Sequence, residues 1–140
     1  MKKNNKGFSL VELIIVIAIM AVLVGVLAPQ FIKYVEQSRR SRDISTAQEI
    51  RESVLAAIAD GRLTGSATQT SKKLGTDISI GSNGSVDTIS EVPKVAGNAA
   101  ITPGGDFTIN YNPSSGVCDV YVGSYCLTNE SWASAYKAKS

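Results

Sequence analysis

An apolar segment from Phe8 to Ala28, followed directly by Pro29, constrains the fold of this chain more than any other feature of its sequence. A helix rises about 1.5 Å per residue, so roughly 20 residues cross about 30 Å of hydrocarbon. A secretory signal peptide also begins with basic residues, but its apolar core is shorter and ends at a small-residue cleavage site. The exit VLAPQF matches that site poorly. The segment therefore predicts a helix that lies in lipid or inside an assembly.

A second helical pattern continues beyond Pro29. Apolar residues recur there mostly at steps of three or four, which is typical of an amphipathic helix with one apolar stripe. The stripe consists of Ile32, Val35, Ile44, Ala47, Ile50, Val54, Leu55 and Ile58. The pattern ends at Asp60-Gly61, where a glycine suits a helix C-cap. We expect one long helix from about Phe8 to Ala59, kinked or loosened near Pro29, with about half of it outside the globular part.

The C-terminal half alternates apolar and polar residues in short runs that are separated by turn residues. The predicted strands are Phe107–Tyr111, Val117–Val122 and Tyr125–Thr128. The stretch 62–105 specifies little beyond turns, for example at 81–84 and 103–105. A small meander is marginal alone, so the sheet should pack on the apolar stripe of the helix. The predicted fold class is α+β, a long N-terminal helix packed on a small C-terminal antiparallel sheet.

The composition excludes several classes of function. The chain has no histidine, which removes histidine metal ligands and nucleophile–histidine pairs. Its acidic residues are scattered and no phosphate-binding loop is present, so we expect no metal, no cofactor and no enzymatic activity. The net charge of +2 is too small to indicate nucleic-acid binding. We expect the basic cluster to be a solvated helix face, with DNA binding as the unsupported alternative; it comprises Lys33, Arg39, Arg40 and Arg42.

Glu12 is the one acidic residue of the apolar segment. A carboxylate inside hydrocarbon costs a few kcal/mol, and such residues are usually functional. The alternative is that Glu12 lies near the membrane surface and extends its side chain to the interface at small cost. Its position alone does not separate the two interpretations.

The residues around Glu12 resemble the N-terminal signature of type IV prepilins and pseudopilins. The match comprises a basic leader that ends at Gly7, the aromatic Phe8, Glu12, and a long apolar helix that contains Pro29. The strong resemblance covers roughly residues 6–38, and the plan of a long helix followed by a small sheet extends it to the whole chain. It implies a type IV pilin, a structural subunit that polymerises through its N-terminal helix into an extracellular filament.

The resemblance also implies a processed precursor. A membrane prepilin peptidase would cut between Gly7 and Phe8, and the new N-terminal Phe8 would be N-methylated. The expected parts are a cleaved leader at 1–7, a transmembrane and filament-core helix at 8–29, an amphipathic continuation at 30–60 and a globular head at 61–140. The implied partners are further copies of the chain, the peptidase, an assembly platform with its ATPase, minor pilins, and the inner or cytoplasmic membrane that holds the subunit before assembly.

Cleavage would give Glu12 a specific task. The freed ammonium of Phe8 needs a counter-charge in or beside hydrocarbon. Glu12 lies about one helical turn away, roughly 6 Å along the axis. The resemblance implies that it pairs with the N-terminus of a neighbouring subunit and guides its register. We expect Glu12→Ala or Glu12→Val to leave processing intact and to block efficient filament growth.

Gly25 and Pro29 weaken the helix at one place. Proline removes the hydrogen bond to the carbonyl of Gly25, and glycine is itself a poor helix former. The pair marks either a tolerated transmembrane kink or a segment that unwinds when helices pack in a filament and gives it extensibility.

Cys118 and Cys126 are the only cysteines of the chain. If the head lies outside the cytoplasm, as the resemblance implies, a small disulfide loop between them is expected. The alternative is a pair of reduced, partly buried thiols.

Two other functions share part of this pattern. A pseudopilin of a type II secretion or competence system has the same N-terminal signature and assembly chemistry. A monomeric signal-anchored surface protein with a small binding domain would keep residues 1–7 and form no filament. Adhesion, twitching motility and DNA uptake use one scaffold, and the sequence does not distinguish them.

Overall fold

The computed structural model describes residues 7–81, 84–86, 88–89, 91, 93–97 and 105–138. Residues 1–6 of the expected leader, and the expected turn residues 82–83 and 103–104, lie outside that part of the chain. Internal contacts divide the chain into two units, Met1–Val35 and Glu36–Ser140. One helix contributes to both units, and the other elements belong to the second.

The N-terminal helix α1 (Leu10–Ala59) is continuous and matches the predicted range closely. The helix ends in the glycine C-cap that the sequence predicts at Gly61. Gly61 has a φ of 71°, its amide donates to the Ile58 carbonyl at 3.0 Å, and the Arg62 amide donates to the Ala57 carbonyl at 2.9 Å. These bonds form a Schellman motif, which pairs the last helical carbonyls and requires a residue that tolerates positive φ.

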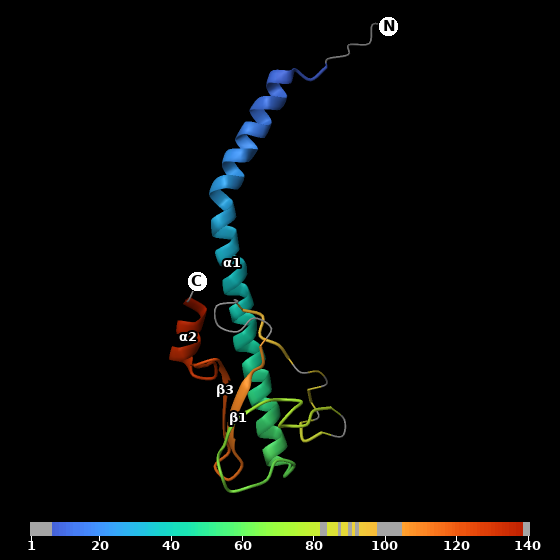
Figure 1. Ribbon diagram of the computed structural model, residues 1–140, viewed down its shortest axis with the longest axis vertical. Coiled ribbons are helices and arrows are strands. Elements are labelled where there is room, and N and C mark those ends of the chain that lie inside the picture. The colour runs from blue at the N-terminus through green and yellow to red at the C-terminus, as the bar shows by residue number, and fades with distance from the viewer. Residues whose placement is uncertain are drawn as a thin grey trace. The chain divides into compact units, whose positions relative to one another are not determined.

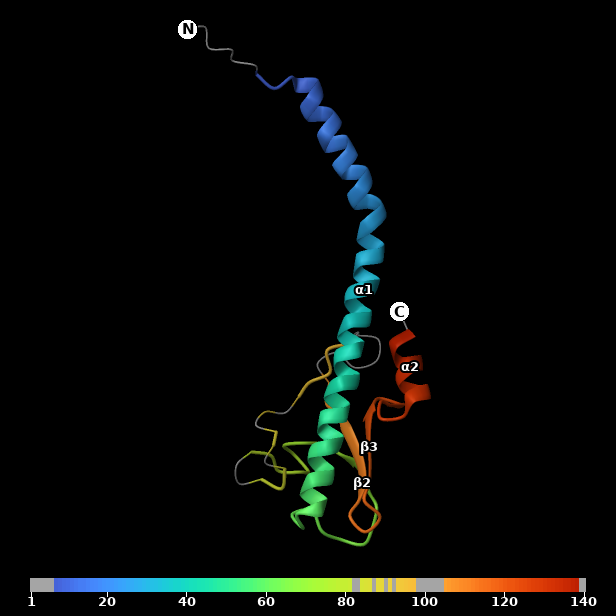
Figure 2. The ribbon, with the colours of Figure 1, turned by 180° about the vertical axis from the view of Figure 1, so that it is seen from behind.

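The second unit contains a four-stranded antiparallel sheet of order β1-β2-β3-β4. Its strands are β1 (Gln69–Lys72), β2 (Thr108–Asn112), β3 (Val117–Val122) and β4 (Tyr125–Cys126). The last three confirm the predicted strands, although β4 is shorter than expected. The sheet lies alongside the C-terminal part of α1 in both views (Figures 1 and 2), so the predicted α+β class is confirmed.

Strand β1 lies in the stretch 62–105, where the sequence specifies little beyond turns. Its pairing with β2 shifts register between Gln69 and Lys72. Ser71 has a φ of 53°, which is uncommon for a residue other than glycine, and its amide donates to Asn110 Oδ1 at 2.7 Å. The four residues of β1 are all polar, so the alternation that marks a strand in a sequence is absent. A bulged edge strand is also a poor template for pairing with another chain.

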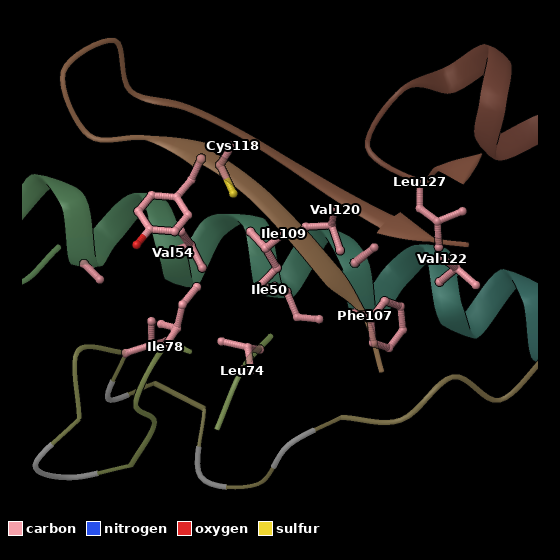
Figure 3. Close-up of a cluster of buried hydrophobic side chains, with 14 of the residues drawn as sticks. Ile50, Val54, Leu74, Ile78, Phe107, Ile109, Cys118, Val120, Val122 and Leu127 are labelled. Carbon is pink, nitrogen blue, oxygen red and sulfur yellow. The ribbon is translucent and has the colours of Figure 1, made fainter. Parts of the chain in front are cut away.

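The core of the second unit lies between α1 and one face of the sheet. Ile109 and Val120 are cross-strand partners on that face, and they lie opposite Ile50 and Val54 of α1 (Figure 3). The other labelled members of the cluster are Leu74, Ile78, Phe107, Cys118, Val122 and Leu127. Burial of this apolar surface is the main force that holds the sheet on the helix.

The buried stripe of α1 contains two charged residues at its N-terminal end. It comprises Arg40, Asp43, Ala47, Ile50, Val54 and Ala57, at alternating steps of three and four. Ala47, Ile50 and Val54 confirm the predicted face, whereas Ile32 is exposed. The prediction that Arg40 belongs to a solvated basic face is wrong, since only 2% of it is exposed. It shares the buried face with Asp43, while the other three members of the basic cluster are exposed.

A second helix, α2 (Glu130–Ala138), follows β4 and was not predicted. Asn129 caps its start, because its Oδ1 accepts the amides of Ser131 and Trp132 at 3.1 and 3.4 Å. The Tyr125 ring contacts two aromatic rings of this helix, with its centre 6.1 Å from that of Trp132 and 5.8 Å from that of Tyr136.

Candidate assembly segment

The start of α1 is stabilised by a side-chain cap that the sequence analysis missed. The Ser9 amide donates to Glu12 Oε2 at 2.9 Å. Ser9 precedes the first helical residue, and Glu12 occupies the third helical position, so the pair forms half of a capping box. The pattern S-x-x-E before an apolar run is the signal that identifies such a box. Glu12 is therefore engaged within its own chain.

Gly7 and Phe8 precede the helix and are accessible. Phe8 is 84% exposed, the largest exposed fraction among the exposed large apolar side chains. A Cβ added at Gly7 would meet no atom within 4 Å. The folded chain itself therefore places no steric demand for glycine at this position. A requirement for glycine would have to come from another molecule that approaches the bond between Gly7 and Phe8.

The first unit exposes an apolar helix on all sides. Every residue from Gly7 to Tyr34 is exposed. Its large apolar side chains between Leu10 and Leu27 are each about half exposed or more. Within the described residues, α1 is the one helix that is long and apolar enough to cross a membrane. A helix that is apolar on all sides is suited to being surrounded by lipid or by other helices.

Gly25 and Pro29 lie inside α1, and the helix continues through both residues. A Cβ added at Gly25 would meet no atom within 4 Å. Close packing within this chain therefore gives no reason for glycine there. An unwinding role of this segment in an assembly stays a prediction.

The structure does not form the expected disulfide between Cys118 and Cys126; both are free thiols and both are buried. The register gives the reason. Cys126 pairs with Tyr121, three residues along β3 from Cys118, or about 10 Å at 3.3 Å per residue. Successive strand residues face opposite sides, so Cys118 points into the core (Figure 3) while Cys126 shares the other face with Tyr121. A disulfide joins Cα atoms less than about 7 Å apart.

The two thiols have different surroundings. Burial, helped by the nearby Asp119 charge, raises the pKa of Cys118 to about 12, so this thiol stays protonated and unreactive at neutral pH. Cys126 Sγ lies 3.3 Å from Thr128 Oγ1, and that hydroxyl donates to Asp119 Oδ1 at 3.1 Å. Over the described part of the chain, histidine, cysteine and acidic residues form no group of three or more that would hold a metal ion.

The prokaryotic N-terminal methylation motif matches residues 2–28 of this chain. The matched range contains Gly7, Phe8 and Glu12, the residues on which the sequence resemblance was based. Over this segment the resemblance is confirmed.

The chain is also similar to fimbrial proteins of two bacteria. It is 37% identical over 65 residues to the type IV major fimbrial protein FimA of Dichelobacter nodosus, a stretch that covers 46% of this chain and 42% of that protein. It is 33% identical over 60 residues to a fimbrial protein of Pseudomonas aeruginosa, covering 43% and 39%. The matches thus span less than half the length of these relatives. No solved structure matches the chain.

Proposed function

We propose that this chain, whose N-terminal segment is similar to that of type IV fimbrial proteins, is the structural subunit of a type IV pilus. It is held in the cytoplasmic membrane as a precursor and a subunit pool. It then polymerises through α1 into an extracellular filament. Its role is mechanical, and the filament serves adhesion, motility or DNA uptake.

The exposed apolar surface of the first unit is the observation that carries this proposal. Keeping apolar surface in water is unfavourable by about 25 cal/mol per Å². The exposed run from Gly7 to Tyr34 therefore needs a cover, and the second unit has its own closed core. Lipid supplies that cover before assembly, and the same helices of other copies supply it in a filament.

Glu12 has the position and the capacity to guide assembly. Removal of residues 1–7 creates an ammonium at Phe8, and a buried ammonium needs a negative partner. A carboxylate accepts several hydrogen bonds, so the bond from Ser9 leaves room for an ammonium on Glu12. Pairing between Glu12 and the Phe8 ammonium of a neighbouring copy would set the axial register of the helices.

Processing at the bond between Gly7 and Phe8 completes the proposal. A prepilin peptidase removes the leader, and methylation of Phe8 follows. The accessible position of both residues ahead of the helix supports cleavage there. Residues 8–29 then form the filament-core helix, residues 30–60 continue it, and residues 61–140 form the head. An assembly ATPase with its membrane platform, and minor pilins, are the expected machinery.

The test is the intact mass and the N-terminal sequence of the protein sheared from the surface of its host. We expect a chain that starts at Phe8, in a high-molecular-weight fraction that contains filaments. Long surface filaments would favour a pilus over a pseudopilus, which shares the same processing. A chain that still starts at Met1 and stays in the membrane fraction would overturn the proposal in favour of an anchored monomer.

A further inference from the structure

A buried polar junction joins three segments of the second unit that are distant in sequence. Arg40 and Asp43 come from α1, residues 96–97 from the connection before β2, and Tyr136 from the last turn of α2. Arg40 is 2% exposed, and Asp43 and Tyr136 are 0% exposed. Charged residues are rarely buried to this extent unless they have partners that replace water.

Asp43 is the centre of this junction. Its Oδ1 accepts the Ala96 amide at 2.7 Å, and its Oδ2 accepts the Gly97 amide at 2.8 Å and the Tyr136 hydroxyl at 2.6 Å. Three donors around a carboxylate compensate for the loss of water. In the part of the chain that the structure describes, every buried side-chain nitrogen and oxygen has a hydrogen-bond partner.

The fit around Asp43 leaves no room for a side chain at residue 97. A Cβ added to Gly97 would lie 2.6 Å from the Tyr136 hydroxyl oxygen, 2.7 Å from Asp43 Oδ2 and 3.0 Å from Arg40 Cγ. The first two contacts are shorter than real Cβ atoms accept, and the third is tighter than most of them. The connection and α2 therefore approach α1 at one point, and neither can shift without disturbing the other.

Arg40 contacts the backbone carbonyl and the ring of Tyr136. Its Nη1 donates to the Tyr136 carbonyl at 2.8 Å, and its guanidinium lies 5.4 Å from the centre of the Tyr136 ring. Its Nε donates to Glu36 at 2.9 Å, which orients the guanidinium along α1. A carbonyl in the last turn of a helix lacks a partner within that helix, so Arg40 caps α2 from a different element.

Among the residues that the structure describes, α2 has little buried surface besides Tyr136, which also belongs to the apolar core cluster. The helix has nine residues and buries only Ala133 and Tyr136. Isolated helices shorter than about 12 residues are marginal in water. The aromatic contacts of Tyr125 add to its packing, but the buried hydrogen bonds of α2 to α1 pass through the junction.

We propose that Arg40, Asp43 and Tyr136 form a polar latch that docks α2 and residues 96–97 onto α1 as one cooperative unit, which opens separately from the β2–β3 part of the core. When the latch opens, both segments lose their shared anchor together. The β2–β3 ladder keeps its own apolar packing, because Ile50 and Val54 hold it on α1.

Hydrogen–deuterium exchange of the full chain in detergent micelles, followed by mass spectrometry of short peptides, tests the latch. Asp43→Asn keeps the shape of the side chain but replaces one carboxylate oxygen with an amide NH₂ group. That group would face the hydrogen-bond donors that the oxygen accepts in the native protein. We expect exchange at residues 96–97 and in α2 to rise by the same factor, about tenfold or more, with β2–β3 unchanged. Glu52→Gln removes an exposed carboxylate from the same helix and should change neither segment.

Tyr136→Phe provides the milder variant if Asp43→Asn does not fold. It removes one hydroxyl and keeps the ring and the carbonyl that contact Arg40. A latch predicts faster exchange at residues 96–97 as well as in α2. Faster exchange in α2 alone would show independent contacts, and a uniform rise that includes β2–β3 would show one global unit. Either result, or no change in either segment, overturns the proposal.

Discussion

At the start of α1, one side chain is assigned two tasks that differ in chemistry. Capping uses Glu12 as a hydrogen-bond acceptor for the Ser9 amide, and a glutamine at that position serves almost as well. Pairing with an ammonium uses its negative charge, which glutamine lacks. The difference between glutamate and glutamine therefore separates the two tasks.

We predict that Glu12→Gln is processed normally and yields as few filaments as Glu12→Ala. The reason is that the glutamine side chain retains the cap but leaves the Phe8 ammonium without a counter-charge. Sheared filament yield, with total processed protein as the reference, measures the effect. Ser9→Ala is a matched control, because the amide of residue 9 remains available to Glu12. Wild-type yield from Glu12→Gln would assign Glu12 to the cap alone.

The cysteine geometry predicts two free thiols in the native protein. Cys118 and Cys126 lie on opposite faces of the β3–β4 ribbon, too far along it to bond. We expect the intact mass without reductant to carry both thiol hydrogens, and alkylation to label both sites only after unfolding. Reductant should leave the midpoint of thermal unfolding unchanged. A mass that is lower by two hydrogens would mean that β4 adopts another register.

Among the helices and strands, sequence periodicity predicts those that are stabilised by apolar packing. α1, β2 and β3 follow from steps of three and four or from alternation, and the structure confirms them. Arg40 and Asp43 keep the same spacing as the stripe, but they are polar, and Arg40 was therefore predicted to lie on a solvated face. Only a partner distant in sequence, such as Tyr136, makes their burial favourable, and periodicity carries no information on distant partners.

The elements that were missed are short and irregular. β1 contains a bulge, and α2 buries only Ala133 and Tyr136, too few to produce a helical pattern. Asn129 followed by Glu130 was the available sign of a helix start. In the assembly segment, Glu12 was recognised but its bond to Ser9 was not, although both residues were visible in the sequence.

The two ends of the connection between β1 and β2 are held by one carboxylate. Asp106 accepts from Lys94 and, at 3.3 Å, from Lys73, which directly follows β1. Hydrogen bonds from Lys94 and then Lys73 lower the pKa of Asp106 below its ordinary 3.8. A carboxyl group whose folded pKa is depressed stabilises the fold above its unfolded pKa, and this contribution is lost as the pH falls through the folded pKa.

We therefore predict that Asp106→Asn lowers the stability of the head at neutral pH and flattens its pH dependence below about pH 4. The effect should be small and should shrink in high salt, because the ion pairs are solvent exposed. Urea unfolding at several pH values, followed by the near-UV circular dichroism of the sheet tyrosines, measures it. Glu49→Gln removes an exposed carboxylate of α1 and is the control. Equal pH profiles for wild type and Asp106→Asn would contradict the prediction.

For the whole molecule, the two units place their apolar side chains in opposite environments. Ile50 is 0% exposed in the core of the second unit, whereas Ile17 in the first unit is 55% exposed. The second unit is stabilised by its own packing. The first unit has no such core among its described residues, and under the proposed function its apolar surface is covered by lipid or by other copies. Stability of the head and stability of the filament should therefore respond to different substitutions.

The same substitution at these two isoleucines tests that separation. Ile50→Ala should reduce the free energy of unfolding of the detergent-solubilised subunit by about 2–5 kcal/mol, because it leaves a cavity in a closed core. Ile17→Ala should change that quantity by less than about 0.5 kcal/mol. In filaments, Ile17→Ala should weaken the contacts between helices more than Ile50→Ala does. Ile17→Ala removes apolar surface that neighbours would bury, so its filaments should dissociate at a lower detergent concentration or temperature. Wild-type resistance of Ile17→Ala filaments would mean that this part of α1 does not form the filament core.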